Sequence, residues 1–455
     1  MEILNTIIMR LLNIIYGMRR KGISYSHLLT LLMIMLPLSC GASGGDENFP
    51  SYFVDQIKKK ISEIRKMSRQ GASFIFITDT HVMANEMHSP RLIKNILDST
   101  YIQTVIWGGD AINPKDQDID NSWRMQLRFD SVFNNSYQIY KVRGNHEFSI
   151  VKNKKYPNGL SYSNEKVSEY LLMNCPSNIH RNTNDSGACY YFFDDTPNKV
   201  RFIVFDTTDS VPSRDYGWGN IPFIHDTQLQ WIADSAVSTT PKSYGLVIVS
   251  HIPFSMKKKR YADLWKLRKF INDINSHTTG IIGNVKYDFT KLDDVKILMC
   301  IAGHIHEDSD KYLDGVLHLT TANDGKWQDV TIKNSKVSRR KSKTVNEQCF
   351  DCLCISNDHK IVHAYRIGYG TDRHYHLDPV NLTINKTKKM KTMLKGPVKW
   401  INLSVKGKNS NIESEPDEIL FIDKSGIVRG IKKGSAKVVA RDQNGNREFF
   451  NVVVQ

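Results

Sequence analysis

Short apolar runs alternate with stretches of helical periodicity between residues 53 and 366. The run at 74–77, Phe-Ile-Phe-Ile, has the aromatic and β-branched content of a buried strand. The stretch 226–236 instead places Leu229, Trp231 and Ile232 on one apolar side of a helix. This alternation of strands and helices predicts a layered α/β fold.

The same two patterns locate the other elements. Apolar runs predict strands at 104–108, 137–142, 190–194, 200–206, 246–249, 295–302, 315–321 and 361–366. Helical periodicity predicts helices at 53–66, 89–99, 122–134, 226–236 and 261–274. Ser89 and Pro90 suit the N-cap and the first position of the helix at 89–99.

The C-terminal part of the chain follows a different pattern. Helical periodicity stops near residue 377, and short alternating runs predict strands at 401–405, 419–422, 436–440 and 449–454. Turn signals containing Gly426, Gly434 and Gly445 separate these runs. Closely spaced short strands predict a small all-β sandwich at 377–455.

Polar side chains follow the predicted strands where each of them ends. Asp79 and His81 follow the strand at 74–77, and an extended chain would place both side chains on one face. Taken alone, the pair also fits a turn followed by a surface histidine. Ligands of α/β folds bind at the carboxyl ends of the strands. The other strand ends add Asp110, Asn145, His146, His251, His304 and His306.

These side chains offer imidazole, carboxylate and amide donors without a thiolate. Such donors suit a pair of borderline divalent cations, and Mn, Fe, Zn and Ni are the candidate metals. Paired cations neutralise an anionic phosphate ester and lower the pKa of a shared water, so that hydroxide exists at neutral pH. The donor set therefore predicts hydrolysis of a phosphoester.

Five motifs occur in a fixed order along the chain: Asp-x-His, Gly-Gly-Asp, Gly-Asn-His-Glu, a lone strand-end His and Gly-His-x-His. In this order they resemble the calcineurin-like metallophosphoesterase superfamily over residues 73–373. The resemblance implies a β-sandwich flanked by helices that hydrolyses phosphomonoesters or phosphodiesters by metal-bound hydroxide attack. It also implies two metal ions. Asp79, His81 and His306 would bind the first ion, and Asn145, His251 and His304 would bind the second. Asp110 would bridge both ions.

The resemblance gives roles to the neighbouring residues as well. His146 is expected to contact phosphate beside Asn145 and to protonate the leaving oxygen, and imidazole is a suitable proton carrier near neutral pH. Arg143 is a candidate phosphate contact, with an ordinary surface arginine as the alternative. Glu147 is expected to be structural. Asn113 stands where purple acid phosphatases carry a ligating tyrosine, so a tyrosine-ligated ferric site is not expected.

The C-terminal strands resemble a bacterial Ig-like domain. The stretch 419–440 carries the pattern Asp-x-x-Gly-x-Val-x-Gly-x-x-x-Gly. The resemblance implies a spacer or adhesion module without chemistry of its own. It also leaves open an alternative function, a cell-surface binding or adhesion protein whose phosphoesterase domain is degenerate.

The N-terminal segment has the features of an export signal. Basic residues at 19–21 precede an apolar run at 28–38 that is short for a membrane span. Cys40 lies between Ser39 and Gly41, which resembles the processing site of bacterial lipoproteins. An ordinary cleaved signal peptide and an uncleaved anchor are the alternatives. We expect a lipidated Cys40 and membrane attachment in the cell envelope, either in the periplasm or at the outer membrane.

The chain thus divides into an upstream segment and signal at 1–40, a tether and leading helix at 41–70, a metallophosphoesterase domain at 71–376 and an Ig-like domain at 377–455. The formal net charge of +15 permits polyanionic partners. Because part of this excess lies in the tail, a nuclease is only an alternative and nucleic acid is not an expected partner. Cys175 and Cys189 flank a polar loop and could form a disulfide.

Overall fold

The computed structural model describes residues 51–81, 88–112, 119–133, 136–147, 149–150, 160–209, 223–256, 264–313, 315–324 and 344–377, together with strands β18 to β24. The proposed signal segment and Cys40 lie outside these residues. None of the described helices is both long and apolar enough to cross a membrane.

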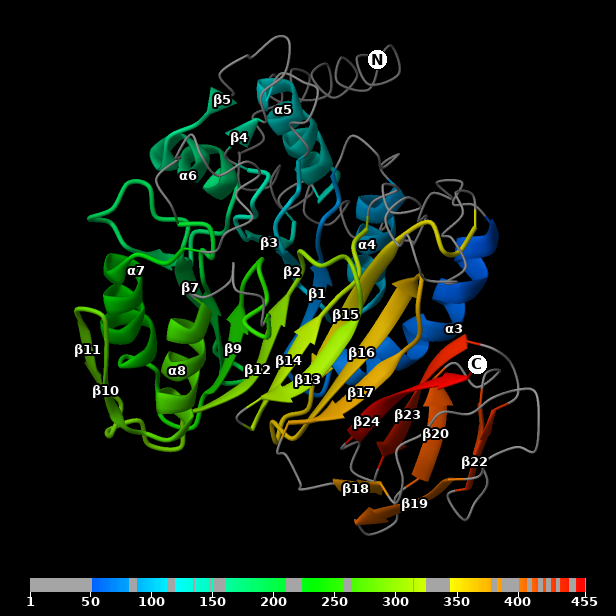
Figure 1. Cartoon of the computed structure of the whole chain (residues 1–455). Coiled ribbons are helices and arrows are strands. Elements are labelled where there is room, and N and C mark those ends of the chain that lie inside the picture. Colours follow the sequence, from blue (N-terminus) through cyan, green and yellow to red (C-terminus); the bar gives the residue numbers. More distant parts are fainter. Residues whose placement is uncertain are drawn as a thin grey trace, which may run out of the picture. The chain divides into compact units, whose positions relative to one another are not determined.

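A six-stranded mixed sheet forms one layer of the fold (Figure 1). Its parallel half comprises β1 (Ser73–Ile77), β2 (Thr104–Trp107) and β3 (Gln138–Lys141). On the other side of β1, an antiparallel half comprises β15 (Cys349–Ile355), β16 (Ile361–Gly368) and β17 (Arg373–His376). The strand order is β17-β16-β15-β1-β2-β3, so the opening strand is central.

A seven-stranded mixed sheet forms the second layer, in the order β13-β14-β12-β9-β8-β7-β6. Its parallel strands are β8 (Val200–Val204), β9 (Gly245–Val249), β12 (Lys296–Ala302) and β14 (Val316–Thr320). The antiparallel strands at its two edges are β6 (His180–Arg181), β7 (Tyr191–Asp195) and β13 (Ser309–Leu313).

The core between the two sheets is apolar and largely aromatic. Phe74 of β1 meets Phe202 of β8 edge-to-face, with ring centroids 5.1 Å apart. Both side chains are buried in one cluster with Val249, Leu317 and Leu353. Full burial of an apolar side chain of this size stabilises the fold by about 1.5–3 kcal/mol. This shared core aligns the two sheets and therefore their carboxyl ends.

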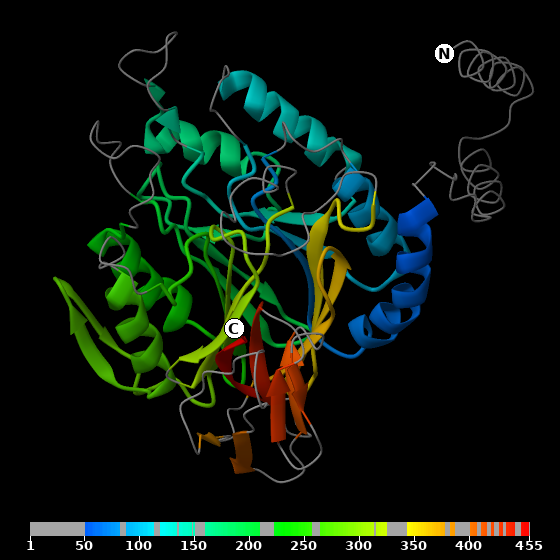
Figure 2. The same ribbon diagram turned by 45° about the vertical axis from the view of Figure 1, so that its right-hand side comes forward.

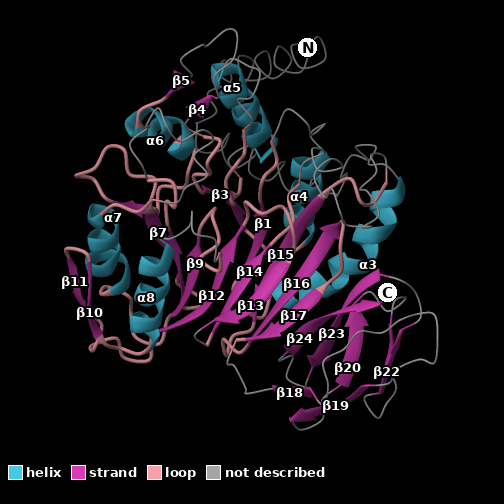
Figure 3. Ribbon diagram, in the orientation of Figure 1, coloured by secondary structure: helices cyan, strands magenta, loops and turns pink. Residues whose placement is uncertain are grey.

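Helices lie outside the two sheets (Figures 2 and 3). α3 (Ser51–Ser68) packs on β15 and β16. α7 (Asp226–Trp231), its π-helical continuation (Ile232–Val237) and α8 (Leu264–Asn275) bury the outer face of the seven-stranded sheet. The other helices of the described residues are α4 (His88–Ser99), α5 (Ile119–Asp130), the 3₁₀ turn Ser131–Phe133 and α6 (Asn164–Leu172). The mixed α/β fold that the alternation predicts is confirmed.

Some sequence predictions differ from the structure in detail. α4 begins at His88, so Ser89 and Pro90 lie inside its first turn instead of forming its cap. The hairpin of β10 (Thr279–Ile282) and β11 (Val285–Asp288) and the two-stranded sheet of β4 (Ser149–Ile150) and β5 (Leu160–Ser161) were not expected. The proposed Cys175–Cys189 disulfide is wrong, because both residues are free thiols.

The C-terminal strands form two further sheets. One sheet joins β18 (Thr383–Lys386), β19 (Ile401–Lys406), β22 (Ile427–Gly430) and β21 (Leu420–Ile422). The other joins β20 (Asn411–Glu415), β23 (Gly434–Arg441) and β24 (Arg447–Val454). All their strand pairs are antiparallel. The Ig-like assignment of this region stays a prediction.

Candidate metal centre

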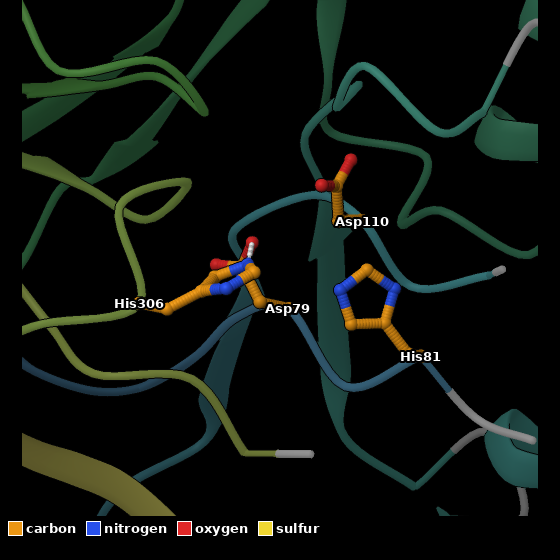
Figure 4. Close-up of side chains that lie close together, drawn as sticks. All are labelled: Asp79, His81, Asp110 and His306. Carbon is orange, nitrogen blue, oxygen red and sulfur yellow. Dashed lines mark hydrogen bonds and ion pairs between the residues drawn. The ribbon is translucent and has the colours of Figure 1, made fainter. Parts of the chain in front are cut away.

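The carboxyl ends of five parallel strands meet at one place in the fold. Each of these strands is followed within four residues by a side chain that can bind a metal. The strands are β1, β2, β3, β9 and β12, and the residues that follow them are Asp79, His81, Asp110, Asn145, His251, His304 and His306. Figure 4 shows four of these side chains, Asp79, His81, Asp110 and His306, lying close together.

Two groups of potential metal ligands share Asp110. In the first group, one ligand atom from each of Asp79, His81, Asp110 and His306 lies within 4.8 Å of all the others. The second group satisfies the same criterion and consists of Asp110, His251 and His304. Asp110 therefore stands where a carboxylate bridging two ions is expected.

Asn145 lies between the two histidines of the second group. Its Oδ1 is 3.1 Å from His251 Nε2 and 2.9 Å from His304 Nδ1. His251 Nδ1 is in turn 2.8 Å from the carbonyl oxygen of Gly108, which fixes the orientation of the ring. The structure thus brings together all seven residues that the sequence proposes as metal ligands.

The backbone reaches this arrangement through left-handed conformations. The φ angles are +52° at Asp79, +41° at His81, +50° at Asp110, +70° at His304 and +60° at His306. Such angles are uncommon outside glycine and cost about 1–3 kcal/mol each, so the surrounding structure must hold them. The chain is not extended after Ile77, so left-handed turns, instead of an extended strand, bring Asp79 and His81 into one ligand group.

Buried polar groups hold these strained turns. The Glu147 carboxylate accepts hydrogen bonds from the backbone N–H groups of Asp110 at 3.1 Å and Ala111 at 2.8 Å, and another from Gly144. Thr78 Oγ1 donates to Asp79 Oδ2 at 2.7 Å. Glu147 is fully buried and holds the backbone of these turns, which agrees with the structural role expected from the sequence.

Two glycines of the motifs leave room for the ligands. A Cβ atom at Gly109, where φ is +94°, would stand 2.5 Å from His251 Nδ1. At Gly303 it would stand 2.0 Å from Thr78 Oγ1 and 2.5 Å from Asp79 Oδ2. The Gly-Gly-Asp and Gly-His-x-His motifs therefore need glycine for steric reasons as well as for the turn.

The charges of the histidines divide them into two classes. Burial lowers the pKa of His81 to about 4 and that of His304 to about 3, so both imidazoles are neutral at pH 7. Burial is also the largest effect on His251, but the charge and hydrogen bond of Asp110 and the charge of Asp79 act together against it and raise the pKa of His251 to about 10. Asp79 likewise raises the pKa of His306 against the effect of burial. The imidazolium of His251 must lose its proton before a cation binds to it.

His146 lies beside the metal ligands and belongs to neither group. Its backbone N–H donates to Asp110 Oδ1 at 2.9 Å, and its Nε2 is 3.7 Å from Asp110 Oδ2. Burial lowers the pKa of His146 below its ordinary value. The imidazole is 16% exposed, which leaves it open to a molecule that reaches the centre.

Arg143 is placed differently from either sequence interpretation. Its side chain is fully buried, and Nη1 donates to Asp206 Oδ2 at 3.1 Å while Nη2 donates to Asn164 Oδ1 at 2.9 Å. Asp206 also accepts hydrogen bonds from Thr208. The guanidinium therefore supports the turn that carries Asn145 from within the protein, and we leave Arg143 out of the substrate contacts.

The family profile of the calcineurin-like phosphoesterases matches residues 72–308, just over half of the chain. The chain belongs to the calcineurin-like phosphoesterase family. The matched range contains every residue of the two ligand groups. Membership in this family supports a metal-dependent phosphoester hydrolase in general.

The solved structures that match this chain share little sequence with it. A dimetal phosphatase from Danio rerio is 16% identical, with 68% of this chain and 100% of that chain covered and a TM-score of 0.44. The GAP50 anchor of the Plasmodium inner membrane complex is 12% identical, covering 68% and 89%, with a TM-score of 0.39. Phosphopantetheinyl hydrolase from Mycobacterium tuberculosis is 12% identical, covering 55% and 89%, with a TM-score of 0.29. No match was found among curated proteins.

Proposed function

We propose that this chain is a dinuclear metallophosphoesterase that hydrolyses phosphomonoesters or phosphodiesters. The observation that carries the proposal is the pair of ligand groups that share Asp110. Asp79, His81, Asp110 and His306 would hold one divalent ion, and Asp110, Asn145, His251 and His304 would hold the other. Mn, Fe, Zn or Ni suits this set of oxygen and imidazole donors.

When bound, two such cations would neutralise the phosphate ester and lower the pKa of a water molecule between them. The protein's own contribution begins with geometry. Left-handed turns, together with the hydrogen bonds that Glu147 and Thr78 make, fix the ligands before a substrate arrives. Because these ligands are already in place, little free energy is spent on rearranging them during the reaction.

His146 is the residue proposed to move a proton. Its Nε2 lies 3.7 Å from Asp110 Oδ2 at the edge of the centre, and in its protonated form it can donate to the leaving oxygen of the ester. Asn145 and His146, adjacent on one turn, are the proposed substrate contacts. A general acid of this kind typically contributes 10²–10⁴-fold to the rate, so we expect His146→Ala to lower kcat by about that factor.

The test of the proposal uses purified protein supplied separately with manganese, zinc and iron. Hydrolysis of an aryl phosphate and of a bis-aryl phosphate separates monoesterase from diesterase activity. We expect Asp110→Asn and His251→Ala to lose activity on whichever ester the wild type cleaves. Undiminished activity in both variants would show that this centre is not the active site.

Metal analysis addresses the alternative of an adhesion protein with a degenerate phosphoesterase domain. About two divalent ions per chain support the enzyme. A chain that binds neither ion and hydrolyses no ester favours the adhesion protein. For the nuclease alternative, cleavage of single- or double-stranded nucleic acid is assayed under the same metal conditions.

Export and lipid attachment at Cys40 form a separate part of the proposal, supported by the basic and apolar pattern before that residue. In a bacterial host, wild-type protein is expected in the membrane fraction and Cys40→Ser in a soluble fraction. Equal membrane association of the two proteins would favour an uncleaved anchor.

A further inference from the structure

A partly buried ion cluster lies next to the metal centre and uses none of its ligands. The cluster consists of Asp308, Asp351, Arg366 and Arg373. Arg366 donates from Nε to Asp351 Oδ1 at 2.8 Å and from Nη2 to Asp308 Oδ1 at 2.7 Å. Arg373 reaches both carboxylates as well. Two positive and two negative charges balance each other, which offsets the burial of Asp351 and Arg366.

The cluster joins the two sheets of the fold. Asp351, Arg366 and Arg373 belong to β15, β16 and β17 of the six-stranded sheet. Asp308 directly precedes β13, the edge strand of the seven-stranded sheet. The hydrogen bonds from Arg366 and Arg373 to Asp308 therefore link the two sheets. The charge pairs therefore set how closely the two sheets approach at this edge.

The first ligand group spans the same two sheets. Asp79, His81 and Asp110 follow strands of the six-stranded sheet, whereas His306 lies on the loop between β12 and β13. Asp308 fixes the far end of that loop, two residues after His306, and also accepts the N–H of Ala322 at 3.0 Å. Because two residues of the loop have left-handed backbones, the loop needs firm anchors at both ends.

Only arginine can make the contacts found at position 366. Besides the two carboxylates, its Nη1 donates to the carbonyl oxygen of Tyr369 at 2.6 Å. Gly370 leaves room for this, since a Cβ atom there would stand 2.6 Å from Nη1. A lysine at 366 keeps the charge but cannot bind both carboxylates in this planar, bidentate manner.

We propose that Arg366 is a positioning residue for the metal centre, which acts through Asp308 on the loop that carries His306. It sets the affinity of the ion shared by His306, Asp79 and His81. The inference rests on the proposed function only in requiring that these residues bind metal. Partners that orient metal ligands typically change metal affinity by 10–100-fold when they are substituted.

The experiment titrates the full chain with Mn²⁺ alone and resolves the two binding steps by calorimetry and electron paramagnetic resonance. His306→Ala identifies the step to which His306 contributes. Arg366→Lys is expected to weaken that step about tenfold and the other step less than twofold. Excess Mn²⁺ is expected to restore occupancy of the weakened site.

Arg201→Lys is the matched control. Arg201 is also buried, pairs with both oxygens of Asp194 and caps a helical carbonyl, but it has no contact with the loop of His306. Wild-type affinity at both steps in Arg366→Lys overturns the inference, as does an equal loss in Arg201→Lys. If Arg366→Lys does not fold, Arg373→Lys replaces it, with a smaller loss at the same step expected and an unchanged affinity counting against the inference.

The two proposals fail in different ways. A wild-type chain that binds no Mn²⁺ overturns both of them. A wild-type chain that binds two Mn²⁺ ions but hydrolyses no phosphoester overturns the enzymatic function, while the Mn²⁺ titrations of Arg366→Lys and Arg201→Lys still decide the role of Arg366.

Discussion

Backbone conformation at single residues determines where the metal ligands point. Gly109 makes this clearest, because its φ is +94° and a side chain there would collide with His251. We expect Gly109→Ala to destabilise the protein by about 1–3 kcal/mol through backbone strain and to displace His251 from the second ligand group. Denaturant unfolding and Mn²⁺ titration measure the two effects.

Gly283 provides the control for this substitution. Gly283 lies on the turn between β10 and β11 and also has a left-handed backbone, with φ at +59°. A Cβ atom there would have Asp226 Oδ1 as its nearest neighbour, at 3.3 Å. Gly283→Ala should cost about 1–2 kcal/mol and leave Mn²⁺ affinity unchanged. If Gly109→Ala keeps wild-type metal affinity, the close contact with His251 does not constrain the centre.

Protonation of the ligands makes metal binding depend on pH. Because Asp110 raises the pKa of His251 to about 10, the imidazole is protonated at pH 7 and must release a proton when a cation binds. His81 and His304, with pKa values of about 4 and 3, are already neutral and release none. Affinity should therefore rise with pH between 6 and 8.

Calorimetry in buffers of different ionisation enthalpy measures this release. We expect binding of the ion that His251 holds to release roughly one proton. The logarithm of the association constant for that ion should then rise by about one per pH unit. His251→Gln removes the titrating group and should flatten the dependence of whatever binding remains. A wild-type affinity independent of pH would mean that His251 is neutral before the metal binds.

At the scale of elements, the sequence predicts the parallel strands well because each is a continuous apolar run that ends in a motif residue. β1, β2 and β12 illustrate this, and their ends hold Asp79, Asp110 and the histidines 304 and 306. β15 was missed, although it pairs directly with β1. The buried Asp351 interrupts its apolar run, and the pairing of β15 spans nearly 280 residues of chain.

The supporting residues could not be predicted for the same reason. Asp308 and Arg366 belong to no short motif, and strands β13, β14 and β15 come between them along the chain. Arg143 stands next to a motif residue, yet its ion pair with Asp206 appears only in the folded structure. Local patterns thus identify the residues at the ends of strands, whereas the contacts that hold them depend on long-range strand pairing.

The ion cluster stabilises the fold, and acid removes part of that stability. Burial opposes the charge on Asp351, but Arg366 and Arg373 outweigh it and lower its pKa from 3.8 to about 2. A lowered pKa contributes stability above pH 3.8, and that contribution is lost as the pH falls through 2. Asp351→Asn should cost about 3–5 kcal/mol at pH 7, because it leaves a buried arginine charge uncompensated.

The difference in stability between wild type and Asp351→Asn should shrink by about 1 kcal/mol between pH 7 and pH 3, as measured by urea unfolding at several pH values. Comparing the two proteins at each pH cancels the contributions of Asp79 and Asp110, whose pKa values are also lowered. A difference that stays constant down to pH 3 would mean that Asp351 is not stabilised as a carboxylate.

At the scale of the whole molecule, the metal centre and the C-terminal strands are built from separate sheets. Among the described residues, β18 to β24 pair only with one another, and every ligand of the centre follows a strand of the first two sheets. Ending the chain after Leu377 retains β17 and every residue of the ion cluster. We expect the shortened protein to bind two Mn²⁺ ions with affinities within about twofold of the full chain.

Activity of the shortened protein then shows what the C-terminal region does. Unchanged kcat and KM on small aryl phosphoesters would agree with a spacer or adhesion module, since such a module takes no part in the reaction. Ending the chain after Ile355 is the contrasting deletion, because it removes β16 and β17 together with Arg366 and Arg373 and should prevent folding. A large rise in KM after the shorter deletion, with metal affinity unchanged, would instead assign the C-terminal strands a part in substrate binding.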